Sequence, residues 1–157
     1  MEKMLTHRDR EYLRVIFSLN GAKIPVGPVD LAKKIGVSKE CAYQKMRRLS
    51  IFGYGEYHLY KGFQLNETAI KLVEEDAKRH HILENFLQKT LDITHHQACQ
   101  EAINMDASIS SDMYHRILHQ ITLSESSCCG YDPSERLTPK NIKRCPWFLH
   151  IIDNANL

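Results

Sequence analysis

Residues 28–49 read PVDLAKKIGVSKECAYQKMRRL, and residues 50–65 continue as SIFGYGEYHLYKGFQL. The first part predicts two short helices joined by a tight turn, because apolar residues recur at helical spacing on either side of Gly36. Glycine ends a helix at low steric cost, and Ser38 is a good N-cap for the helix that follows. This second helix directs three apolar residues inward: Ala42, Met46 and Leu49.

A helix-turn-helix of this kind places its second helix in the major groove of DNA. The next segment alternates like a strand pair, over residues 56–60 and 63–65, with Lys61-Gly62 at the turn. Two helices followed by a basic hairpin predict a winged helix, whereas the alternative is a helical hairpin that serves only for packing. The side chains expected to contact bases or phosphates are Ser38, Lys39, Tyr43, Gln44, Lys45, Arg47, Arg48 and Lys61.

Composition and charge agree with a DNA-binding protein. The 157 residues are 43% hydrophobic and 25% charged, which is ordinary for one or two small globular domains. Residues 1–62 hold 12 Lys and Arg against 6 Asp and Glu, while residues 63–157 hold 9 against 13. A basic N-terminal half is typical of a surface that contacts phosphates. No apolar run is long enough to cross a membrane, and the N-terminus lacks a signal-peptide core, so a cytoplasmic location is expected.

Helical periodicity continues on both sides of the opening stretch. It predicts an amphipathic helix over 6–19 and a long helix over 66–91, with a possible break near Lys78. It also predicts a helix over 95–107 and one more after Ser110 or Ser111. The apolar faces of the later helices are too large to remain wet, so they close a core or pair with a second copy of the chain. We expect a homodimer, because helix-turn-helix proteins commonly read two half-sites by symmetry.

Two further segments carry a resemblance to a known family. They read RHHILENFL from Arg79 and LDITHHQACQEAINMDASIS from Leu91. Together with the helix-turn-helix and the wing, they resemble the DtxR/MntR family of metal-dependent transcriptional repressors over roughly residues 5–122. The resemblance implies that Fe(II) or Mn(II) binds between the first helix and the dimerisation domain. Metal would then set the geometry of two winged domains on a palindromic operator.

The resemblance also implies a set of metal ligands, matched position by position. Glu11 matches a ligand on the first helix, and Asp106 matches a carboxylate on a later helix. His80 and Glu84 match ligands of the long helix, one turn apart on one face. Cys99 takes the position of a histidine in an ancillary site. The alternatives are a plain hydrogen-bonded pair for His80 and Glu84, and a buried small residue for Cys99.

Three departures weaken the primary metal site of this family. Ile103 and Ala107 stand at ligand positions but cannot bind a metal, and Arg14 replaces an acidic ligand of the manganese branch. The imidazole, carboxylate and thiolate that remain suit Fe(II), Zn(II) or Co(II). Other candidate sites are the pairs His95–His96 and His115–His119, and a thiol cluster of Cys128, Cys129 and Cys145.

The predicted fold is mainly α, with a winged helix-turn-helix, a helical dimerisation domain and an irregular tail. The predicted domains are 1–75 for DNA binding, 76–123 for dimerisation and metal sensing, and 124–157 for a Cys-containing tail that packs on the body. The predicted function is a metal-dependent regulator, a repressor by resemblance. The alternatives are a regulator that senses thiol state or another ligand, and a protein-binding adaptor. An enzyme is not expected, since no phosphate loop, nucleophile elbow or His-Glu-x-x-His helix is present.

Overall fold

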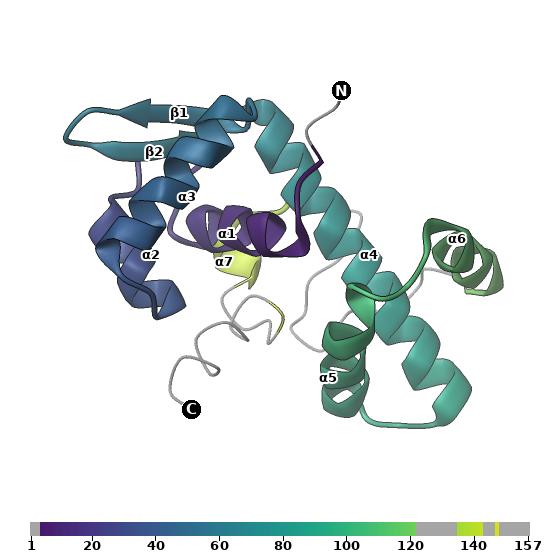
Figure 1. The fold of residues 1–157 in the computed structure, drawn as a ribbon. Coiled ribbons are helices and arrows are strands. Elements are labelled where there is room, and N and C mark those ends of the chain that lie inside the picture. The colour runs from purple at the N-terminus through teal and green to yellow at the C-terminus, as the bar shows by residue number, and fades with distance from the viewer. Residues whose placement is uncertain (1–3, 122–134, 143–146, 148–157) are drawn as a thin grey trace. The chain divides into compact units, whose positions relative to one another are not determined.

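The computed structural model describes residues 4–121, 135–142 and 147. Contacts divide the chain after Val73 into two compact units, and the second runs from Glu74 to Trp147. The predicted mainly helical fold with a two-stranded wing is confirmed, whereas the predicted domain boundaries at residues 75 and 123 stay a prediction. The elements shown in Figure 1 are α1 (His7–Ser18), α2 (Pro28–Ile35), α3 (Lys39–Ile51), β1 (Gly55–His58), β2 (Gly62–Leu65), α4 (Glu67–Leu91), α5 (His95–Asp106), α6 (Ser111–Gln120) and α7 (Pro139–Ile142).

The first helices begin and end where the sequence signals predict. Thr6 caps α1 in a capping box, in which its hydroxyl accepts from the backbone N–H of Asp9 and the Asp9 carboxylate accepts from the backbone N–H of Thr6. Gly36 ends α2 in the left-handed conformation, with φ of 79°. The hydroxyl of Ser38 then accepts from the backbone N–H of Cys41 at the start of α3.

The wing differs in detail from the predicted hairpin. The antiparallel strands β1 and β2 pair from Gly55↔Leu65 to His58↔Gly62, so the connection is residues 59–61 rather than Lys61-Gly62. Tyr60 adopts a positive φ of 63° there, and the backbone N–H of Lys61 donates to the carbonyl of His58. Val26 forms an additional antiparallel bridge with Phe63.

The long helix α4 runs without the predicted break near Lys78. Asn66 caps it, since its side-chain carbonyl accepts from the backbone N–H of Ala69 at 3.0 Å. Thr94 caps α5, and Ser110 caps α6. Among the described residues, no helix is both long and apolar enough to cross a membrane.

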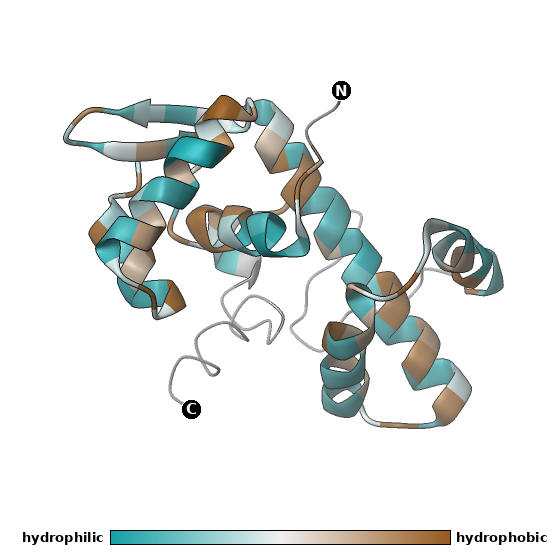
Figure 2. Cartoon of the chain, viewed as in Figure 1, coloured by the Kyte–Doolittle hydropathy of each residue, from teal (hydrophilic) through white to brown (hydrophobic). Residues whose placement is uncertain are grey.

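Each unit has its own apolar core. Apolar residues alternate with polar ones along α4, α5 and α6, as Figure 2 shows. The first unit buries residues from α1, α2, α3 and β2, including Leu13, Ile16, Leu31, Met46 and Phe63. The second unit buries a cluster from α4, α5 and α6: Ile82, Leu83, Leu87, Ala98, Ala102 and Ile117. These cores position the polar residues of the two candidate sites.

Candidate functional site

Three of the five predicted metal ligands lie together inside the second unit. The Sγ atom of Cys99, on α5, is 3.4 Å from Nε2 of His80, on α4. The same Nε2 is 3.7 Å from Oε2 of Glu84, one helical turn further along α4. One ligand atom of each residue lies within 4.8 Å of the others, and all three residues are buried. An imidazole, a carboxylate and a thiol at this spacing are a donor set for a divalent transition metal.

Burial prepares His80 to act as a metal ligand. Desolvation lowers the pKa of His80, although the hydrogen bond and charge of Cys99 oppose the shift. The charge of His81 lowers this pKa further, and that of Asp106 raises it. Burial favours the neutral imidazole, whose ring nitrogen can donate a lone pair to a metal.

The other two predicted ligands have different contacts. Glu11, in the first unit, accepts a hydrogen bond from Arg8 Nη1 at 2.7 Å and lies 3.6 Å from His7. Oδ1 of Asp106 lies 3.5 Å from Nε of Arg79. Neither carboxylate belongs to the buried cluster of metal-binding atoms found among the described residues. The assignment of Glu11 and Asp106 as ligands stays a prediction.

Two of the three positions that depart from the family pattern lie on or next to α5, and neither contributes a donor. Ile103 is half-buried on α5, and Ala107 is exposed as the residue that ends this helix. Arg79 is held near the same turn, because its guanidinium donates to the carbonyl of Ile109 and lies over the ring of Tyr114. The C-terminal end of α5 is therefore fixed by an arginine.

Two aromatic neighbours of His80 were missed in the sequence analysis. Trp147 stacks on the imidazole, with ring centroids 5.1 Å apart and an interplanar angle of 14°. His81 meets the same ring edge-on at 5.2 Å, and its Nδ1 lies 2.7 Å from the carbonyl of Ala77. The only sequence signal for Trp147 was its place in an apolar part of the tail, and nothing local linked it to His80.

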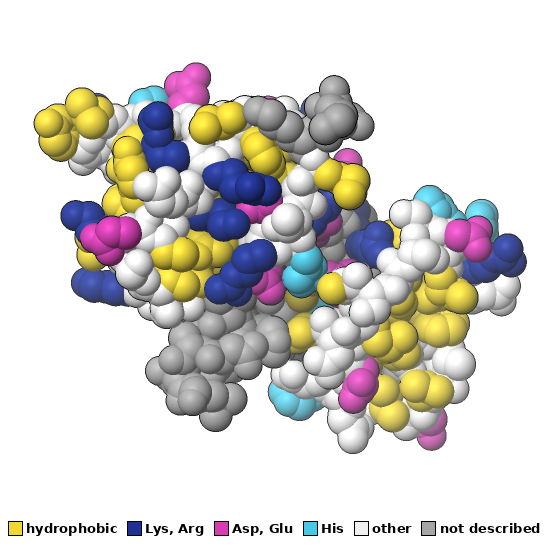
Figure 3. Space-filling model, viewed as in Figure 1, with side chains coloured by type: hydrophobic (Ala, Val, Ile, Leu, Met, Phe, Trp, Pro, Cys, Tyr) yellow, Lys and Arg dark blue, Asp and Glu magenta, His cyan; other side chains and the backbone are white. Residues whose placement is uncertain are grey.

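The predicted DNA-contacting residues lie on α3, at its N-cap Ser38 and at the tip of the wing. The ring of Tyr43 on α3 meets the ring of Tyr57 on β1 edge-on, with ring centroids 5.3 Å apart. This contact joins the helix to the wing. Figure 3 shows Lys and Arg side chains gathered over the face of the first unit that carries α1 and α3. The exposed members of the predicted set are Ser38, Lys39, Tyr43, Gln44, Arg47, Arg48 and Lys61, whereas Lys45 is half-buried.

Lys45 and Arg48 are held by a buried carboxylate that the sequence analysis did not single out. Asp9 on α1 is fully buried, and its Oδ1 accepts from Lys45 Nζ at 2.7 Å. Its Oδ2 accepts from Arg48 Nη2 at 3.4 Å and from the backbone N–H of Thr6 at 2.9 Å. Burial alone would raise the pKa of Asp9, but the hydrogen bonds from Lys45 and Thr6 lower it to about 2. Asp9 therefore ties α1 to the predicted recognition helix.

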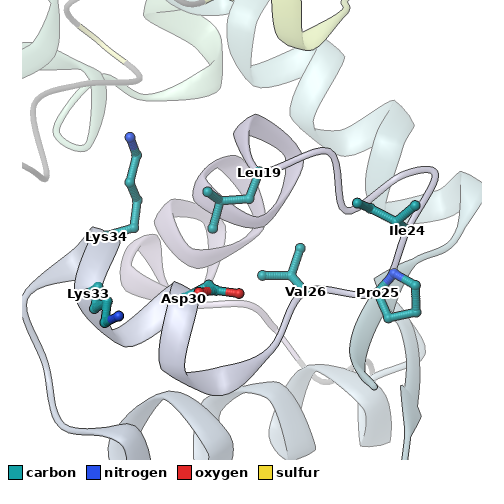
Figure 4. A pocket seen from close by; sticks show the side chains of 7 residues that line it. All are labelled: Leu19, Ile24, Pro25, Val26, Asp30, Lys33 and Lys34. Carbon is teal, nitrogen blue, oxygen red and sulfur yellow. The ribbon is translucent and has the colours of Figure 1, made fainter. Parts of the chain in front are cut away.

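The first unit also has an open pocket of about 390 Å³ between α2 and residues 19–26, which follow α1. Figure 4 shows apolar side chains along one part of it and the charged side chains of α2 along another. Its lining offers a single carboxylate and no thiol or imidazole, so it is not a metal centre. The lining residues are Leu19, Ile24, Pro25, Val26, Asp30, Lys33 and Lys34.

The remaining candidate sites gain little support. Nε2 of His95 accepts from the side-chain amide of Gln88 at 3.1 Å, and Nδ1 of His115 lies 2.6 Å from the carbonyl of Ser111. No group of three or more metal donors among the described residues includes either histidine pair. The proposed thiol cluster of Cys128, Cys129 and Cys145 lies outside the described residues.

Two domain models of one family match consecutive parts of the chain. Residues 4–63 match the N-terminal DNA-binding domain of iron-dependent repressors. Residues 67–130 match the metal-binding and dimerisation domain of the same repressors. The chain belongs to the iron-dependent repressor family. The predicted resemblance to DtxR/MntR repressors is thereby confirmed.

Proteins named as regulators of transcription are among the relatives of this repressor-family chain. The transcriptional regulator MntR of Escherichia coli O6:H1 is 29% identical over 102 residues, which cover 65% of each chain. The crystal structure of the hypothetical protein SSo2273 from Sulfolobus solfataricus has a TM-score of 0.70 at 16% identity, and covers 83% of this chain and 100% of that one. A manganese-dependent transcriptional repressor in complex with manganese has a TM-score of 0.62 at 24% identity, over 77% of this chain and 56% of that one.

Proposed function

We propose that this protein is a metal-responsive regulator of transcription that binds a palindromic DNA operator as a homodimer, in the cytoplasm, and acts as a repressor. The observation that carries the proposal is the buried cluster of His80, Glu84 and Cys99 in a chain whose other unit has an exposed basic helix. We assign residues 1–75 to DNA binding, 76–123 to dimerisation and metal sensing, and 124–157 to the tail.

The buried cluster supports a divalent transition metal as the effector. Burial of a carboxylate is costly, and a cation held between Glu84, His80 Nε2 and Cys99 Sγ would offset that cost. A bound metal would supply a positive charge that joins α4 to α5. The Cys99 thiol loses its proton when it acts as a ligand, so we expect metal binding to release a proton. A thiolate among the donors favours Fe(II), Zn(II) or Co(II), because Mn(II) prefers oxygen ligands.

The exposed side chains of α3 support binding to duplex DNA. Lys39, Gln44 and Arg47 are exposed along this helix, so they are available to phosphates and base edges. Lys61 at the tip of the wing is available for a further phosphate contact. Lys45 has a different role in this proposal, since its ammonium group is held by Asp9. A metal bound in each chain of the dimer would shift the population toward the spacing that fits two half-sites.

Removal of one buried donor tests the metal centre. Cys99→Ser is expected to weaken Co(II) binding by at least about 100-fold, because a hydroxyl is a far poorer ligand than a thiolate. Anaerobic titration with Co(II) should give thiolate-to-cobalt charge-transfer absorption in the parent protein and none in the variant. Elemental analysis should find one bound ion per chain in the parent protein, and circular dichroism should show that the variant remains folded.

Exposed and buried histidines provide a matched pair for this test. His80→Ala should lose Co(II) binding, whereas His96→Ala should retain it, because His96 is exposed at the start of α5. Binding that survives both Cys99→Ser and His80→Ala would place the metal elsewhere and contradict the proposed centre.

A salt titration tests the DNA interface independently of the operator sequence. Lys39→Ala should weaken binding of the Co(II)-loaded protein to a short mixed-sequence duplex, and should reduce the slope of log affinity against log salt concentration by about one. Lys78→Ala is the control, since this exposed lysine lies on α4 in the second unit. Absence of salt-dependent binding in the parent protein would favour the protein-binding adaptor instead.

A further inference from the structure

The environment of the proposed metal ligand His80 is unusual in one respect. A histidine that binds a metal through one ring nitrogen generally donates a hydrogen bond from the other, which fixes the orientation of the ring. Nε2 of His80 is the nitrogen that faces Cys99 and Glu84. The other nitrogen, Nδ1, is buried and has no hydrogen-bond partner among the described residues. Something other than the usual hydrogen bond must therefore orient this imidazole.

Aromatic contacts orient the imidazole of His80 in place of this hydrogen bond. The indole of Trp147 lies almost parallel to the imidazole of His80, at 14° and with centroids 5.1 Å apart. The ring of His81 meets the imidazole edge-on at 87°, so the two neighbours restrain it in different directions. A partial rotation of the imidazole about its Cβ–Cγ bond would turn its plane away from that of the indole and break the parallel contact. Stacking of two aromatic rings stabilises their relative orientation, in addition to the stabilisation that comes from burying their apolar surface.

We propose that Trp147 is a positioning residue of the metal centre, which holds His80 Nε2 toward Cys99 and Glu84. This inference rests on the proposed function, because it concerns the same three donors. Trp147 is 2% exposed, so its indole also covers one face of His80 and keeps water from that face. Loss of the indole should therefore weaken metal binding although Trp147 itself provides no ligand atom.

The chain offers a direct optical measurement of this contact, because Trp147 is its sole tryptophan. The fluorescence of a tryptophan that touches a metal ligand responds to the ion bound there. Co(II), which has a partly filled d shell, should quench Trp147 in the full chain. Zn(II), which has a filled d shell, should alter the emission much less. The His80→Ala variant keeps the tryptophan and lacks the ligand, so neither ion should alter its emission at the concentrations that fill the parent site.

Two substitutions separate positioning from general packing. Trp147→Ala should weaken Co(II) and Zn(II) binding by about 10–100-fold, the range for residues that orient metal ligands. Trp147→Phe retains a ring that can stack on the imidazole, so it should restore affinity to within a few-fold of the parent protein. The cobalt absorption spectrum should change in Trp147→Ala, since a reoriented imidazole alters the ligand field, and should be unchanged in Trp147→Phe.

The outcomes distinguish this inference from the proposed function. If the parent protein binds Co(II) through Cys99, but Trp147→Ala leaves both affinity and spectrum unchanged, then Trp147 does not position His80 and the inference is overturned while the metal centre stands. If the parent protein shows no thiolate-to-cobalt absorption, then the proposed metal centre itself is overturned. If Trp147→Ala lowers the thermal stability but binds Co(II) with parental affinity and spectrum at a temperature where it is folded, the role of Trp147 is only structural.

Discussion

Replacement of Asp9 by alanine is expected to lower the free energy of unfolding of the first unit by about 2.5 kcal/mol. The hydrogen bonds that hold the pKa of Asp9 at about 2, against an ordinary value of 3.8, correspond to roughly 2.5 kcal/mol at 1.36 kcal/mol per unit. This figure already includes the capping interaction with the backbone N–H of Thr6, which is one of the hydrogen bonds that lower the pKa of Asp9. Urea unfolding of the full chain at neutral pH, followed by circular dichroism, measures this difference.

The pH dependence of the free energy of unfolding tests whether the charge of Asp9 causes this stabilisation. The pKa of Asp9 is lower in the folded state than in the unfolded state, so its stabilisation is complete above pH 4 and is lost as the pH falls toward 2. Asp9→Asn keeps the shape of the side chain and removes its charge. The stability difference between the parent protein and Asp9→Asn should therefore shrink over this range. A stability difference that stays constant from pH 7 down to about pH 2 would show that the ion pair is not its source.

A double-mutant cycle assigns the stabilisation to the contact between α1 and α3. Lys45→Met should be destabilising in the parent protein, because it removes a charged donor from a fully buried carboxylate. In the Asp9→Asn background the same substitution should cost much less, which gives a coupling energy of about 1–3 kcal/mol. Additive effects would mean that Lys45 and Asp9 are close without being energetically coupled. The outcome bears on function, since α3 is the proposed recognition helix.

The second large effect is expected at Gly62, where the wing meets the body of the first unit. Gly62 has φ of +109°, and a Cβ atom there would lie 2.1 Å from the carbonyl oxygen of Val26. Val26 and Phe63 exchange two backbone hydrogen bonds beside this point, each 2.9 Å long. Gly62→Ala must therefore break this bridge or distort the backbone, at a cost of about 3 kcal/mol or more.

Gly53 is the matched control for this substitution. It also has a positive φ, of 82°, but a Cβ atom there would meet nothing within 4 Å. Gly53→Ala should therefore show only the conformational cost of about 1 kcal/mol. Amide hydrogen exchange at Val26 and Phe63 should accelerate in Gly62→Ala and remain slow in Gly53→Ala. Similar unfolding energies for the two variants would show that the close approach to Val26 is relieved without loss of the bridge.

Local sequence signals determined most of the helices and their ends. Caps such as Ser38 and Thr94 act within three residues, and helical periodicity depends on near neighbours, so both can be predicted without knowledge of the fold. The pairing of His80 with Glu84 was also legible, because a spacing of four residues places two side chains on one helix face. The turn of the wing was harder to predict, because its positive φ falls on Tyr60 and not on a glycine.

Tertiary structure alone decided how the two candidate sites are completed. Cys99 reaches His80 from another helix, and only the family resemblance suggested it beforehand. Periodicity assigned Lys45 to the outer face of its helix, but Asp9 binds it from 36 residues away in the chain. Trp147 reaches His80 from still further along the sequence. Contacts between distant segments depend on how helices pack, and packing geometry leaves no local pattern in the residues that meet. The sequence by itself therefore determined the family, the helices and the donor types, while the packed structure decided which charges are buried and which donors meet.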